Sequence, residues 1–100
     1  MNFGLTDNDV QTINNIFRKF DTIDKVVIYG SRAKGNFKPS SDIDLIMEGN
    51  NLNLTLLNKV SSMLYDLPIP YIVDLSIKNT IEKKELLEHI DRVGKVFYQK

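Results

Sequence analysis

Three segments of this chain show the 3.6-residue hydrophobic periodicity of amphipathic helices. The stripes that we expect to face inward are Val10, Ile13, Phe17 and Phe20 in the first segment, Leu56, Val60, Met63, Leu64 and Leu67 in the second, and Leu86, Leu87, Ile90 and Val93 in the third. Thr6, followed by acidic residues, is the expected N-cap of the first helix. Pro68 and Gly94 are the expected stops of the second and third helices.

Short apolar runs bounded by polar or turn residues predict strands between these helices. The expected strands are residues 25–29, 42–47, 71–77 and, as a short edge strand, 95–99. Residues 31–34 are expected to form one helical turn that ends at Gly35, before a polar loop over 36–41. The alternation of helices and strands predicts an α/β layer pair. The first two strands should be antiparallel, because their connection is too short for a parallel crossover through a full helix.

Composition narrows the class of protein. One hundred residues suit one domain, 1–100, and 13 basic residues balance 13 acidic ones. This balance argues against a polynucleotide substrate, without excluding a local basic patch. The absence of cysteine excludes disulfides and thiolate metal sites. No apolar run is long enough to span a membrane and no signal-peptide pattern is present, so we expect a cytoplasmic protein.

Gly30 and Ser31 lie where the first strand ends and suit a phosphate-binding turn. A glycine lets backbone amides approach an anion closely, and the serine hydroxyl adds a donor. Arg32 and Lys34 are available to offset phosphate charge, although Arg32 would serve equally well as a surface residue. A Gly-Ser dipeptide alone is weak evidence for such a site.

Three aspartates are the candidate metal ligands and catalytic residues. Alternation along a strand places Asp42 and Asp44 on one face, where their repulsion would call for a cation such as Mg²⁺. Asp74 interrupts an apolar strand, and would complete the cluster if its strand lies beside that of Asp44. It would then hold a second metal or accept the proton of an attacking hydroxyl. The alternatives are solvated carboxylates on an edge strand or at a strand end. The lone His89 is expected to be a surface or packing residue.

The spacing of these residues resembles a known family. Gly30-Ser31, ten residues and then Asp42-Ile43-Asp44 are similar to the GSx10DxD signature of the DNA polymerase β-like nucleotidyltransferase superfamily. The segments GSRAKG and SSDIDL, with VDL later in the chain, resemble those of the minimal nucleotidyltransferase (MNT) proteins. The resemblance covers nearly the whole chain. One departure from the family pattern is Lys34, where Arg is common. Lysine lacks the bidentate phosphate recognition of arginine.

The resemblance implies the fold of that superfamily, a mixed sheet flanked by helices. It also implies that Asp42, Asp44 and Asp74 hold a pair of Mg²⁺ ions and that Gly30, Ser31 and Arg32 bind the nucleotide. Many small members of the family are antitoxins that transfer AMP from ATP to a tyrosine of a HEPN-domain ribonuclease toxin. We therefore expect an adenylyltransferase that acts on a HEPN partner. Either that partner or a second copy of the chain would complete the cleft. Two alternatives remain: a non-catalytic antitoxin that binds its toxin stoichiometrically, and nucleotidyl transfer to a small molecule.

Overall fold

The computed structural model describes residues 2–100 as a four-stranded mixed sheet flanked by helices. The elements in chain order are α1 (Asp7–Phe17), β1 (Lys25–Tyr29), α2 (Gly30–Lys34), β2 (Ile43–Glu48), α3 (Leu54–Tyr65), β3 (Val73–Ile77), the 3₁₀ turn η1 (Lys78–Thr80), α4 (Lys84–Val93) and β4 (Lys95–Gln99). This is the order that the hydrophobic pattern predicts, with η1 added. No helix within residues 2–100 has both the length and the apolar character needed to cross a bilayer.

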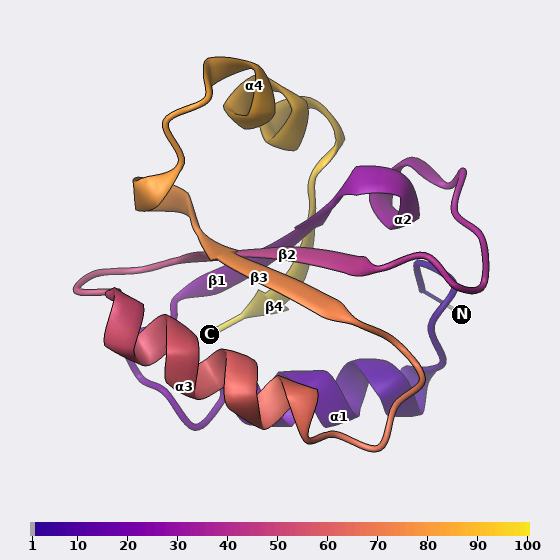
Figure 1. Ribbon diagram of the computed structural model, residues 1–100, viewed down its shortest axis with the longest axis horizontal. Helices are drawn as coiled ribbons and strands as arrows, with labels where there is room; N and C mark the ends of the chain where they lie inside the picture. Colours follow the sequence, from indigo (N-terminus) through magenta and orange to yellow (C-terminus); the bar gives the residue numbers. More distant parts are fainter. Residues whose placement is uncertain (1) are drawn as a thin grey trace.

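The strands lie in the order β3-β2-β1-β4. β1 pairs antiparallel with both β2 and β4, whereas β2 and β3 are parallel and are joined through α3 (Figure 1). The prediction that the first two strands run antiparallel is therefore confirmed, and so is the position of β4 at an edge. As a result, the ends of β1 and β3 that carry candidate residues lie on either side of β2.

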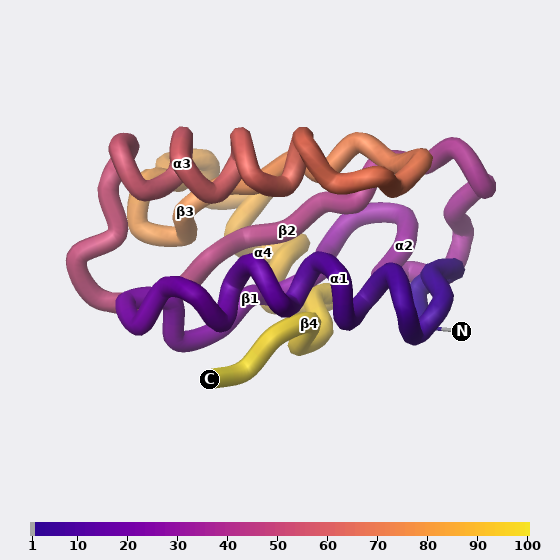
Figure 2. Tube along the Cα trace, turned by 90° about the horizontal axis from the view of Figure 1, so that it is seen from below, coloured from indigo at the N-terminus to yellow at the C-terminus, as the bar shows by residue number. Residues whose placement is uncertain are grey.

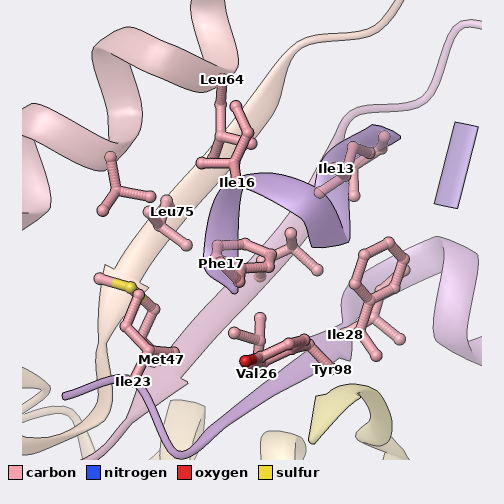
Figure 3. Close-up of a cluster of buried hydrophobic side chains, with 14 of the residues drawn as sticks. Ile13, Ile16, Phe17, Ile23, Val26, Ile28, Met47, Leu64, Leu75 and Tyr98 are labelled. Carbon is pink, nitrogen blue, oxygen red and sulfur yellow. The ribbon is translucent and has the colours of Figure 1, made fainter. Parts of the chain in front are cut away.

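The two faces of the sheet are covered unequally. Helices α1 and α3 lie next to each other across one face (Figures 1 and 2), where they bury the larger hydrophobic core. Figure 3 shows this core, with side chains that include Ile13, Phe17, Leu64 and Leu75. On the other face α4 covers a smaller cluster formed by Val27, Tyr29, Ile46 and Ile90. Because side chains alternate along a strand, residues that share a face with Ile46 point toward the α4 side.

Local interactions explain where the helices begin. Thr6 caps α1 as predicted, in a capping box in which its side chain accepts from Asp9 N–H and the Asp9 side chain accepts from Thr6 N–H. Asn53 caps α3 by accepting from Leu56 N–H, and the helix begins at Leu54, so the predicted hydrophobic stripe begins within its first turn. The helix α1 ends at Phe17, and Phe20 packs on the core from the following turn.

Candidate active site

Two of the predicted aspartates lie side by side on neighbouring strands. Asp44 of β2 is in register with Asp74 of β3 and with Tyr29 of β1. Directly paired residues project from the same face of a sheet. Asp44 and Ile46 are two positions apart on β2, and so this face is the one that α4 covers in part. The structure therefore brings Asp44 and Asp74 together, although they come from distant parts of the chain.

The strand β2 begins at Ile43, one residue later than predicted, so that Asp42 lies just before it with an exposed side chain. Asp42 is close enough to Asp44 to influence its ionisation. Burial raises the pKa of Asp44 most, the negative charges of Asp74 and Asp42 raise it further, and His89 opposes them. The three carboxylates thus form one electrostatic cluster in which ionised Asp44 is disfavoured.

Gly30 places the Gly-Ser turn against this cluster. Its backbone has φ +73°, a conformation that favours glycine. A Cβ atom at this position would lie 2.3 Å from Oδ2 of Asp44, with no room for a methyl group. Ser31 follows in the first turn of α2 and is half-buried. The turn expected to bind phosphate and the carboxylates expected to bind metal are therefore direct neighbours.

Arg32 is not a surface residue, and the surface alternative for it is wrong. Its side chain is 2% exposed, and its guanidinium donates hydrogen bonds to the carbonyl oxygens of Phe3, Pro39 and Ser41. A direct contact between Arg32 and a nucleotide stays a prediction. Lys34, two residues later, is exposed.

Tyr29, Ser76 and His89 border the carboxylates, although the sequence assigned none of them to the site; His89 was expected to be a surface or packing residue, and it does pack here. Tyr29 packs edge-on against His89 of α4, with ring centroids 6.3 Å apart. Burial and the charges of Asp44 and Asp74 raise the pKa of Tyr29, and a side-chain hydrogen bond with Ser76 lowers it. Two of these residues have a signal in the sequence. Ser76 lies two positions after Asp74 and so shares its face of the strand, and Tyr29 directly precedes Gly30. The position of His89 depends on how α4 packs over the sheet, which no local pattern reveals.

The chemistry of these residues fits a magnesium ion that is shared with a phosphate substrate. Within residues 2–100, no group of three or more Asp, Glu, His or Cys side chains is arranged to hold a metal ion by itself. The repulsion among Asp42, Asp44 and Asp74 is nevertheless what a divalent cation relieves. Mg²⁺ commonly takes one or two protein carboxylates and completes its coordination with water and substrate phosphates. The carboxylates therefore fit such an ion, with the nucleotide supplying the remaining ligands.

We expect Asp44→Asn to stabilise the metal-free protein at neutral pH. A carboxyl whose pKa is raised by folding favours the folded state below its unfolded pKa, and this contribution is lost as the pH rises through the folded pKa. The Tm difference between the variant and the wild type should thus be small near pH 4 and grow toward pH 7. Thermal unfolding in EDTA measures it, with Asp21→Asn as an exposed control. A difference independent of pH would contradict the expectation.

The face with the carboxylates is open rather than enclosed. Asp74 and Asp42 are exposed, and Asp44 is only half-buried. A hollow of about 850 Å³ lies elsewhere, between the end of α3 and the residues that lead into β3. It belongs to the opposite face of the sheet, because Leu64 and Val73 of its lining pack in the larger core. None of the predicted site residues lines this hollow. An acceptor for a reaction at the carboxylates would therefore approach from solvent.

The sequence matches the family model described as polymerase beta, nucleotidyltransferase, over residues 11–100. No curated protein sequence matches the chain. Solved structures do share its fold. A chain of a toxin-antitoxin structure with AMP-PNP is 18% identical at a TM-score of 0.75, over 92% of this chain and 74% of that one.

Two further similar chains come from toxin-antitoxin complexes. One belongs to the MntA-HepT complex, with 18% identity and a TM-score of 0.62 over 95% of this chain and 74% of that one. The other belongs to a tri-AMPylated HEPN toxin from Shewanella oneidensis in complex with MNT antitoxin, with 19% identity and a TM-score of 0.55 over 91% of this chain and 73% of that one. At these identities the likeness shows a common fold.

Proposed function

Because this chain belongs to the polymerase β nucleotidyltransferase family, we propose that it transfers AMP from ATP to a tyrosine hydroxyl of a HEPN-type toxin and acts as its antitoxin. The observation that carries the proposal is the register of Asp44 with Asp74 beside Gly30. The similar structures support the choice of substrates, since one contains AMP-PNP and another an AMPylated HEPN toxin.

In the proposed reaction, the acceptor oxygen forms a bond to the α-phosphorus of ATP, and the bond from that phosphorus to the bridging oxygen of the β-phosphate breaks. Pyrophosphate leaves, and the hydroxyl proton passes to Asp74, the more exposed partner in the pair with Asp44. Gly30 and Ser31 hold the departing phosphates through backbone amides and the serine hydroxyl. Asp42 and Asp44 would hold Mg²⁺, which when bound neutralises the charge that develops on the phosphates.

The open carboxylate face fits a protein acceptor. Asp42 and Asp74 reach solvent, so a tyrosine presented on the surface of a folded partner has access to them. The partner then supplies the rest of the cleft and excludes water from the transferred phosphoryl group. Association with a HEPN protein is accordingly part of the catalytic arrangement that we propose.

Label transfer tests this function. The chain is incubated with MgCl₂, a HEPN-type protein, and ATP labelled at either the α- or the γ-phosphate. We expect the α-label alone to become attached to a tyrosine of the partner, with one pyrophosphate released for each AMP transferred. EDTA should stop the reaction. A tight complex without label would instead support stoichiometric neutralisation and contradict the proposal.

A further inference from the structure

Arg32 lies at the meeting point of the segments that lead to all three carboxylates. Its Nε and Nη2 both donate to Ser41 O, at 3.0 and 2.9 Å, and Nη2 also donates to Pro39 O at 3.2 Å. Its Nη1 donates to Phe3 O at 2.9 Å. The guanidinium thus uses four of its five N–H donors on backbone carbonyls.

The aromatic rings of Phe37 and Tyr71 complete the surroundings of this guanidinium. Its central carbon is 5.1 Å from the Phe37 ring centroid and 4.9 Å from that of Tyr71, distances at which cation–π attraction operates. Among residues 2–100, Arg32 takes part in no ion pair with a carboxylate. Its charge is therefore balanced by carbonyl oxygens and ring faces, with its donors occupied in holding backbone.

These contacts fix the backbone that carries the aspartates. Ser41 O belongs to the peptide unit that leads into Asp42, and the bidentate contact with Arg32 sets the orientation of that unit. Lys38 and Ser41 close the preceding turn with two hydrogen bonds. The loop is therefore held both by its own hydrogen bonds and by Arg32. Tyr71 lies three residues before Asp74, and its ring packs on Arg32 just before β3 begins at Val73.

We propose that Arg32 is a positioning residue, which holds the Asp42–Asp44 segment and the approach to Asp74 in register with the Gly30-Ser31 turn and does not bind nucleotide itself. The inference deepens the proposed nucleotidyl transfer and rests on it for its kinetic test. A residue that orients metal ligands changes metal affinity by about ten- to a hundred-fold when it is removed. A residue that contacts the nucleotide directly changes the KM for ATP instead.

The decisive variant is Arg32→Ala, tested with its missing group added back. We expect the Mg²⁺ concentration for half-maximal AMP transfer to rise at least about ten-fold, while the KM for ATP at saturating Mg²⁺ changes about two-fold or less. Millimolar guanidinium should restore the Mg²⁺ dependence, because it fits the vacated carbonyls and ring faces. Urea, which is uncharged and of similar shape, should not restore it. Lys19→Ala, which removes an exposed cation just after α1, is the control.

A second readout is independent of catalysis. Amide hydrogen exchange at residues 38–42 should accelerate in Arg32→Ala and return toward the wild-type rate with guanidinium, and Lys19→Ala should match the wild type. If the Ala variant does not fold, Arg32→Lys replaces it and should show a smaller shift in Mg²⁺ dependence. Absence of AMP transfer by the wild type, together with these exchange changes in Arg32→Ala, would refute the proposed function alone. Unchanged exchange and Mg²⁺ dependence, or a shift confined to the KM for ATP, would overturn the positioning role.

Discussion

Replacement of Asp42 and Asp44 together by asparagine is expected to lower the rate of AMP transfer by about three orders of magnitude or more, roughly 4 kcal/mol of transition-state stabilisation. Asp44 lies against Gly30, and Asp42 is close enough to raise the pKa of Asp44. Asparagine keeps the shape of both side chains while it removes the negative charge that would hold Mg²⁺. The fold should persist, because neither side chain belongs to the hydrophobic core. The measurement is initial transfer of α-labelled AMP, with circular dichroism and the Tm recorded on the same samples.

Asp24→Asn combined with Asp66→Asn is a matched control for this double variant. It removes the same number of charges from exposed positions away from the carboxylate cluster. It should transfer AMP at a rate close to that of the wild type. Transfer by the Asp42/Asp44 variant at the wild-type rate would rule out the proposed chemistry. Continued binding of the HEPN partner without transfer would show that recognition and catalysis use different residues.

Among substitutions that add a single methyl group in the site, Gly30→Ala is expected to lower AMP transfer most. Alanine at φ +73° costs about 1–2 kcal/mol of folding stability in itself. Its Cβ would also lie 2.3 Å from Asp44 Oδ2, so the carboxylate must move. We expect transfer to fall by about a hundred-fold, or roughly 3 kcal/mol, on the scale for lost electrostatic contacts in active sites.

Gly35 separates the two effects of this substitution. It has φ +90°, and no atom lies within 4 Å of the position where its Cβ would be. Gly35→Ala therefore carries the backbone strain without the collision, and it should lose stability comparably while it retains most of the activity. Equal losses of activity in the two variants would mean that contact with Asp44 is not what requires glycine at position 30.

The sequence predicted the strands and the antiparallel pairing of β1 with β2 because the relevant signals are local. The run Lys25–Tyr29 is bounded by polar residues and Gly30, and β1 occupies the predicted residues. The short connection to β2 left no room for a parallel crossover, and the antiparallel pairing followed from it. Asp74 was recognised as a candidate because a charged residue interrupts an apolar strand, and the parallel pairing of β2 with β3 places it beside Asp44.

The surroundings of the carboxylates were less accessible, because they depend on contacts between distant segments. Arg32 has no sequence neighbour that would mark it as buried, and its partners are carbonyl groups, which every residue carries. His89 reaches Tyr29 only through the packing of α4 on the sheet. The contact of Tyr71 with Arg32, just before β3 begins at Val73, likewise joins segments far apart in the sequence.

The parallel alignment of β2 with β3 has a further effect, on the time at which the protein becomes competent during synthesis. The β1–β2 hairpin brings Gly30 next to Asp44 early, because little chain separates them. Asp74 joins them only after α3 and β3 have left the ribosome and the crossover has closed, a slower step because the intervening segment must lose its freedom first. A nascent chain of this design would remain inactive until most of it has been made.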